Sequence, residues 1–181
     1  MKIIESIQKR YSLRNYADKP IEKEKIERCL EAARLAPSAC NAQPWKFVVV
    51  DKPELKEQVA NAARAEMLNM NKFANEAPVI IAIVMEPANV TSTLGSKIKR
   101  KHYPLMDIGI AAEHICLQAT EEGLGSCMIG WLNEKKVKKT LGVPSARRIP
   151  LLITLGYPSE QQESWRPRKE FDEVVVYNKY K

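Results

Sequence analysis

The stretch Val79–Met85, with the sequence VIIAIVM, is the longest uninterrupted apolar run in the chain. It is far shorter than the ~18 to 20 apolar residues that span a bilayer. Apolar side chains at every position, instead of at alternate positions, are typical of a strand covered on both faces of its sheet. The run therefore predicts a buried β-strand with packed structure on both sides.

Helix and strand patterns precede this run. Residues 21–36 carry apolar side chains at helical spacing, and Pro37 ends the pattern. Residues 46–50, KFVVV, form a β-branched run, and a second helix is predicted from Pro53 to about Met70. Strand and helix patterns thus mingle along the chain, which favours an α+β or α/β class.

Residues 86–104 show no sustained periodicity and predict an irregular excursion or lid. From Leu105 to about Glu122 a wide apolar stripe predicts a long, largely buried helix, which Gly123 terminates. Shorter elements are expected after it, namely a strand at 126–130, a helix at 134–141 and a strand at 151–155.

The length and composition indicate one ordinary globular domain. The chain has 181 residues, 45% hydrophobic and 28% charged, which excludes the disordered, collagenous and coiled-coil classes. Its formal net charge of +7 favours anionic partners such as nucleotides, flavin phosphates, RNA or acidic membranes.

The cysteines predict reduced thiols instead of a metal site. Cys29, Cys40, Cys116 and Cys127 form no C-x-x-C motif, and the chain has only two histidines. Residues 1–15 lack the apolar core of a signal peptide. We therefore expect no bound metal and a cytoplasmic protein.

Familiar catalytic and phosphate-binding motifs are missing from the sequence. Its seven glycines form neither G-x-G-x-x-G nor a P-loop, and no serine–histidine–aspartate triad is suggested. If the chain binds a nucleotide, arginines must hold the phosphate. The segment Arg10–Arg14, RYSLR, places two guanidinium groups around the Ser12 hydroxyl and suits an anion, although a solvated polar turn explains the spacing as well.

The loop at residues 37–45, PSACNAQPW, joins the first long predicted helix to a strand. Asn41 and Gln43 each present a donor and an acceptor, as recognition of the imide edge of a flavin or a pyrimidine requires. Ordinary turn chemistry, in which Ser38 and Asn41 bond their own backbone, accounts for the same residues.

Taken in order, these motifs resemble the nitroreductase family of FMN-dependent NAD(P)H oxidoreductases. The landmarks span nearly the whole chain, and P-S-x-x-N-x-Q-P-W is the most specific of them. They are R-x-S-x-R at 10–14, the loop at 37–45, D-x-G-x-A at 107–111 leading to GLGSCMIGW at 123–131, and LGYP at 155–158 with R-x-R at 166–168.

The resemblance implies an α+β fold of three α/β/α layers with a mixed, mostly antiparallel central sheet. It also implies an intertwined homodimer with two FMN sites at the subunit interface, each built from both chains. Residues 1–181 would form one FMN-binding domain, in which 86–104 is a variable lid and 166–181 is an arm onto the partner subunit. Within that arm, VVVY at 174–177 could add a strand to the neighbour.

Roles for individual residues follow from the resemblance alone. Arg14 would lie beside the flavin pyrimidine, and one backbone N–H near Gly130 would point to flavin N5. The phosphate would be held by Arg10, Ser12, Arg166 and Arg168, the partner chain would supply Ser38, Ala39 and Asn41, and the backbone of Met128, Ile129 and Gly130 would follow the isoalloxazine.

The chemistry of such a site belongs to the flavin. NAD(P)H would give a hydride to N5, and a nitroaromatic, quinone or related acceptor would take two electrons in a ping-pong cycle. No catalytic acid is required, and Arg14 would act as an electrostatic stabiliser of the reduced flavin.

Two alternatives stay open at this point. The clusters KIKRK at 97–101, KKVKK at 135–139 and RPRK at 166–169 motivate a basic nucleic-acid-binding module, although no recognition motif accompanies them. A flavin-binding sensor without turnover would have much the same sequence.

Overall fold

The centre of the fold is an antiparallel sheet, seen in a computed structural model that describes residues 2–64, 70–87, 101–160 and 166–180. Its described strands follow the order β1-β2-β4-β3. Thus β2 and β4 are inner strands, while β1 and β3 form the two edges. Their bounds are Trp45–Val50 for β1, Val79–Met85 for β2, Gly125–Ile129 for β3 and Arg148–Gly156 for β4.

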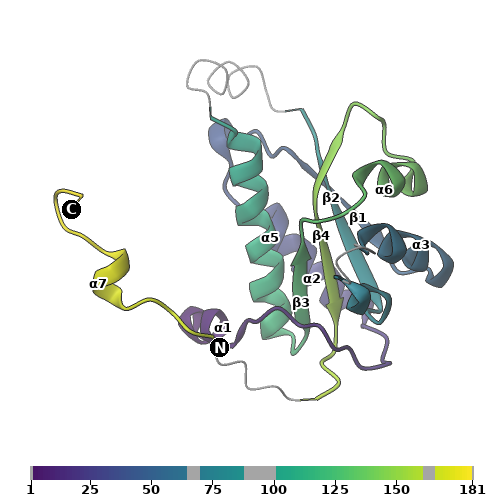
Figure 1. The fold of residues 1–181 in the computed structure, drawn as a ribbon, viewed down its shortest axis with the longest axis horizontal. Coiled ribbons are helices and arrows are strands. Elements are labelled where there is room, and N and C mark those ends of the chain that lie inside the picture. Colours follow the sequence, from purple (N-terminus) through teal and green to yellow (C-terminus); the bar gives the residue numbers. More distant parts are fainter. Residues whose placement is uncertain (1, 65–69, 88–100, 161–165, 181) are drawn as a thin grey trace.

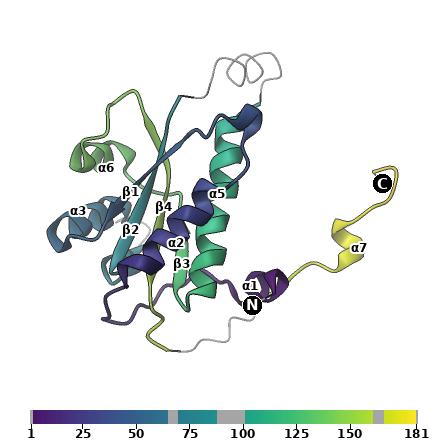
Figure 2. The same cartoon turned by 180° about the vertical axis from the view of Figure 1, so that it is seen from behind.

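Helices cover both faces of this sheet (Figures 1 and 2). On one face, Ile81 and Ile83 of β2 join a core with α2 (Lys23–Arg34) and α5 (Tyr103–Glu121). On the other face, Ile80 and Ala82 join a core with α3 (Pro53–Ala63) and α6 (Glu134–Leu141). The prediction of a strand covered on both sides is confirmed, and the fold has the expected α/β/α layers.

The end of helix α3 and the start of helix α5 differ from the sequence prediction. Helix α3 ends at Ala63 instead of continuing to Met70, and Arg64 is already extended. The Asn71 side chain accounts for this end, because its Nδ2 donates to the Ala63 carbonyl at 3.0 Å. Helix α5 begins at Tyr103, two residues before the predicted start, with a proline in its first turn.

Strand β4 is longer than the predicted 151–155. It begins at Arg148 and passes through Pro150, which has no N–H for a ladder hydrogen bond. The pairing with β2 shifts between Ile83 and Met85, so the proline lies where the ladder is irregular. Proline at this position hides the first part of the strand from a pattern-based prediction.

After helix α1 (Ile3–Lys9), the chain runs alongside the edge strand β3. Ser12 forms a parallel bridge with Ser126, and the Leu13 N–H donates to the Ser126 carbonyl at 2.9 Å. The isolated bridge gives the otherwise antiparallel sheet its mixed character. It also places Arg10–Arg14 along the edge that β3 leaves open.

Tyr16 fixes the end of this segment against the sheet. Its buried hydroxyl donates to the Leu13 carbonyl at 3.1 Å and lies 2.7 Å from Thr154 Oγ1. Gly156 makes room for the ring, since a Cβ there would lie 2.5 Å from Tyr16 Cδ1. Burial raises the pKa of Tyr16, so the phenol stays protonated and able to donate.

The C-terminal part of the chain leaves the body of the protein. Figure 1 shows α7 (Phe171–Val174) projecting away from the sheet and its helices. Phe171 and Tyr177 are 68% and 77% exposed. Val174 ends the short helix and Val175 is extended, so VVVY is not a strand within this chain. No helix in the described ranges is long and apolar enough to cross a membrane.

The hydrogen bond from the Tyr16 hydroxyl to the Leu13 carbonyl is expected to stabilise the fold measurably. Tyr16→Phe should lower the free energy of unfolding by about 1 to 3 kcal/mol, because the buried Leu13 carbonyl loses its donor. Urea unfolding followed by circular dichroism measures the change. Tyr180→Phe removes the same hydroxyl from a side chain that is 96% exposed and should change stability by less than about 0.5 kcal/mol. Equal effects of the two substitutions would contradict the assignment.

Candidate functional site

The segment Arg10–Arg14 presents alternate side chains to solvent at the β3 edge. Leu13 is fully buried, whereas Ser12 and Arg14 are exposed and Arg10 is half-buried. This alternation follows from the extended backbone that the Ser12–Ser126 bridge imposes. The hydroxyl and both guanidinium groups are therefore available to a ligand along one edge of the sheet.

Two arginines from the far end of the sequence join this segment. Arg166 donates to the Gln8 carbonyl at 3.1 Å, which fixes it beside the end of α1. Burial lowers the pKa of Arg166, and the positive charges of Arg10 and Arg168 lower it further, while Glu113 opposes them. We call Arg10, Arg166 and Arg168 the arginine cluster.

The arginine cluster is suited to an anion. Its guanidinium groups remain charged in any protein environment, so their mutual repulsion is relieved only by negative charge. Glu113 on α5 supplies one carboxylate, at 3.1 Å from Arg10 Nε. The sequence prediction that these three arginines act together is consistent with this placement.

Arg14 lies next to a residue that the sequence analysis missed. Its guanidinium carbon is 5.9 Å from the centre of the Phe73 ring, in the short helix η3 (Lys72–Asn75). A cation over an aromatic face is weakly attracted to it, which restrains the long arginine side chain. No motif around Phe73 marks it, because the contact joins residues 59 positions apart in the sequence.

Residues Met128, Ile129 and Gly130 share the β3 edge with the arginine segment. They follow Ser126, which bridges to Ser12, and they pass from half-buried to buried to exposed. Gly130 follows the last residue of the strand. One edge of the sheet therefore combines a basic segment with a strand end that reaches the surface at Gly130.

The predicted loop at 37–45 adopts a strained conformation. Cys40, Asn41 and Gln43 all have positive φ angles, of 53°, 51° and 46°. Non-glycine residues in this region cost roughly 1 to 3 kcal/mol each, and such strain persists where surrounding contacts hold it. Strain of this kind gathers at functional sites, which supports the candidacy of the loop.

Several hydrogen bonds hold the loop in place. The Gln43 N–H donates to Ser38 Oγ at 2.9 Å, and Gln43 Nε2 donates to Asn41 Oδ1 at 3.2 Å. Gln43 therefore shapes the loop through both its backbone and its side chain. The Ala39 N–H donates to Asp107 Oδ1 at 3.1 Å, which ties the loop to α5. Asp107 is almost fully buried, and its Oδ2 has no partner in the described part of the structure.

The loop and the arginine cluster occupy different places on α5. Asp107, which holds the loop, and Glu113, which contacts Arg10, are six residues apart. At 1.5 Å and 100° per residue, they are separated by about 9 Å along the helix and about 120° around it. Within one chain, the predicted site residues therefore form two groups: Ser38, Ala39 and Asn41 in one, and all the others near the β3 edge.

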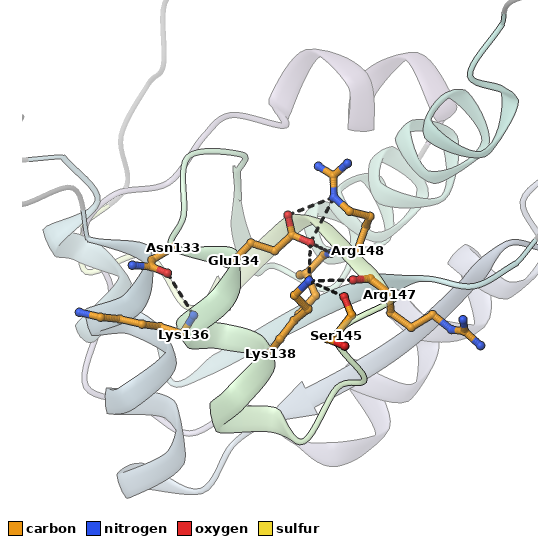
Figure 3. A network of polar contacts seen from close by, with 8 residues as sticks. Asn133, Glu134, Lys136, Lys138, Ser145, Arg147 and Arg148 are labelled. Atoms are coloured by element: carbon orange, nitrogen blue, oxygen red, sulfur yellow. Dashed lines mark hydrogen bonds and ion pairs between the residues drawn. The ribbon is translucent and has the colours of Figure 1, made fainter.

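The basic run at 135–139 is partly engaged in a structural network (Figure 3). Lys138 Nζ donates to the carbonyls of Ser145 and Arg147, at 3.1 and 2.9 Å. Glu134 lies between Lys138 and Arg148, at 3.4 and 3.1 Å. These contacts fasten α6 to the start of β4, so part of this positive charge is balanced internally. Residues 88–100, which carry most of the run at 97–101, lie outside the described residues.

Three of the four cysteines are buried in the layers of the fold. Burial raises the pKa of Cys29 and of Cys116 to about 12, and it raises the pKa of Cys127 as well. Cys40 is exposed in the strained loop. Across the described ranges, no three histidine, cysteine or carboxylate side chains gather closely enough to hold a metal ion.

Comparison with known proteins gives a consistent match. The model of the family described as the nitroreductase family matches residues 7–157. A solved FMN-dependent nitroreductase from Clostridium difficile is 30% identical, with a TM-score of 0.80 and coverage of 98% of this chain and 99% of that one. An NADH dehydrogenase from Thermus thermophilus is 29% identical, covering 84% and 85% of the two chains. An iodotyrosine deiodinase from Thermotoga neapolitana is 26% identical over 95% of each.

The buried thiols predict a loss of stability at alkaline pH. Their pKa is higher in the folded than in the unfolded chain, so their contribution is complete below pH 9 and falls as pH rises toward 12. Between pH 8 and 10, removing one such thiol by Cys29→Ala should reduce the drop in unfolding free energy by about 1.4 kcal/mol. Urea titrations at both pH values measure it. A drop of the same size in wild type and in Cys29→Ala would refute the account.

Proposed function

Because the chain belongs to the nitroreductase family, we propose that residues 1–181 form one FMN-binding domain that oxidises NAD(P)H. The observation that carries the proposal is the arginine cluster, in which the Gln8 carbonyl holds Arg166 beside the end of α1 and the positive charges of Arg10 and Arg168 act on it. A repelling group of guanidiniums at the surface needs an anion, and the FMN phosphate is one.

The residues present fit the phosphate of FMN. The arginine cluster would donate charge-assisted hydrogen bonds, and the exposed Ser12 hydroxyl would add a neutral one. Arg166 is already oriented by the Gln8 carbonyl, so part of its entropy is lost before the ligand arrives. The phosphate would bind where α1 ends and the β3 edge begins.

Arg14 would serve the other end of the cofactor. Held near Phe73, it would keep a fixed positive charge beside the flavin pyrimidine, where negative charge develops on reduction. When bound, FMN would supply hydride acceptance at N5 and ping-pong transfer of two electrons to a nitroaromatic, quinone or related acceptor. No residue of this chain would need to act as a catalytic acid.

The backbone of Met128–Gly130 would lie along the ring system. These residues stand on the same sheet edge as Ser12 and Arg14, which supports one continuous binding surface from phosphate to flavin. Gly130 is exposed at the end of the strand, and it has no side chain that would project toward a flat ligand. An N–H in this stretch would hydrogen-bond to flavin N5.

A second chain would complete each site. The separation of the 37–45 loop from the arginine cluster around α5 supports supply of Ser38, Ala39 and Asn41 by a partner subunit. Exposed apolar side chains on α1 and α5 offer an interface, because large apolar patches at a surface mark association. These side chains are Ile3, Ile4, Ile7, Leu105, Met106 and Ile110.

The C-terminal arm would embrace that partner. It projects from the body with Phe171 and Val174 exposed, and Val175 is extended. No described strand pairs with the outer side of β1, so VVVY of one chain has an open sheet edge to join on the other.

The acceptor class rests on the relatives. Reduction of nitroaromatics and quinones is favoured by the nitroreductase and NADH dehydrogenase names, and the deiodinase relative adds halogenated phenols. We propose that residues 86–104 govern access to the flavin. Residues 88–100 of that segment lie outside the described residues, and its last two residues, Tyr103 and Pro104, already belong to helix α5.

The first prediction of this proposal concerns colour and reduction. The purified protein should show flavin absorbance that bleaches when NADH or NADPH is titrated in without oxygen. The double variant Arg10→Ala with Arg168→Ala should lose most bound FMN, since each substitution removes a charge-assisted contact worth about 1.5 to 3 kcal/mol. Absorbance at equal protein concentration measures the occupancy.

Arg34→Ala is the matched control, because this arginine pairs with Glu31 on the exposed side of α2. It should keep full occupancy. A double variant that retains all of its FMN would remove the phosphate assignment. A wild-type protein that stays colourless and cannot be loaded with FMN would overturn the flavoenzyme proposal.

A further prediction concerns the arm. Deletion of residues 172–181 should shift the protein toward monomer, because the exposed apolar side chains that would cover the partner are removed. Sedimentation velocity at several concentrations measures the equilibrium. A full-length chain with Val174→Asp and Val176→Asp tests the same contact without truncation, and dimers of unchanged stability in both variants would refute the arm model.

A further inference from the structure

Glu113 is the unexpected member of the candidate phosphate site. It stands on α5 with its Oε1 3.1 Å from Arg10 Nε, among guanidinium groups that otherwise suit an anion. The side chains of Arg10 and Glu113 are 20% and 41% exposed. An ion pair this accessible contributes little to folding stability, so fold stability gives little reason for a carboxylate here.

The contact leaves most of Arg10 available. A guanidinium group has five N–H donors, and Glu113 engages it through Nε. One carboxylate can accept from at most about two of these five donors, so others are left for a phosphate. Glu113 therefore offsets the repulsion between Arg10 and Arg166 without occupying every donor of Arg10.

The charges of the site match one class of anion. The three guanidinium groups of the arginine cluster and the Glu113 carboxylate carry a net charge of +2. A phosphate monoester carries about −1.5 to −2 at pH 7. We propose that Glu113 tunes the strength of this site, and that its negative charge lowers the affinity for a phosphomonoester below what the arginines alone would give. The inference rests on the proposed FMN function.

Glu113→Gln separates the effect of the negative charge of Glu113 from the effect of its size and hydrogen-bonding capacity. Glutamine has the same length and keeps an amide oxygen that can accept from a guanidinium N–H, but it removes the negative charge. Apoprotein of this variant should bind FMN at least threefold more tightly than wild type at 50 mM salt. The ratio of the FMN affinity of the variant to that of wild type should approach one at about 0.5 M salt, because salt screens charges that are this exposed.

Riboflavin distinguishes a charge effect from a structural one. It lacks the phosphate, so wild type and Glu113→Gln should bind it equally, and the preference for FMN over riboflavin should rise in the variant. A general change of the fold would shift both ligands together. Glu113→Asp keeps the charge and should retain wild-type FMN affinity. Glu31→Gln makes the same substitution on the exposed side of α2 and should change neither ligand.

Flavin fluorescence quenching, measured over a range of salt concentrations, reports each of these affinities. Wild type that binds FMN while Glu113→Gln binds it equally or more weakly would overturn the role of Glu113 and leave the proposed function standing. Failure of every variant, wild type included, to bind FMN would instead refute the proposed function, and the inference with it.

Discussion

Strand β2 has apolar side chains on both faces, and this single constraint organises the molecule. An antiparallel sheet often leaves one face in water, but here Ile80 and Ile81 point to opposite sides and both are fully buried. Burying one isoleucine contributes about 1.5 to 3 kcal/mol, so both faces must be covered by helices. Only the edges of the sheet remain open, and the proposed phosphate-binding segment Arg10–Arg14 lies along one of them.

The sequence predicted what local patterns determine. Helix α6 was predicted at its observed bounds, because Asn133 accepts from the Lys136 N–H at one end and Gly142 takes a left-handed conformation at the other. The apolar run of β2 was equally informative. The end of α3 was missed, since a side chain eight residues further on terminates it.

The candidate site shows the same division between local and distant contacts. Arg10, Ser12 and Arg14 were recognisable from their spacing and from the family resemblance. The contact of Arg14 with Phe73 and that of Glu113 with Arg10 join separate elements, so no spacing in the sequence could reveal them. Asp107 was visible as part of a motif, but its bond to the Ala39 N–H became apparent only in the fold.

The open side of β1 has a consequence for how the protein is made. Strand β1, which ends in three consecutive valines, pairs with β2 on one side only among the described residues. In a newly made chain that has not yet met the proposed partner, the outer edge of β1 would face solvent. Such an edge can pair with any exposed strand nearby. The yield of native protein would then depend on the rate of docking to the partner relative to the rate of aggregation. Slow synthesis would lengthen the time during which the edge of β1 is exposed.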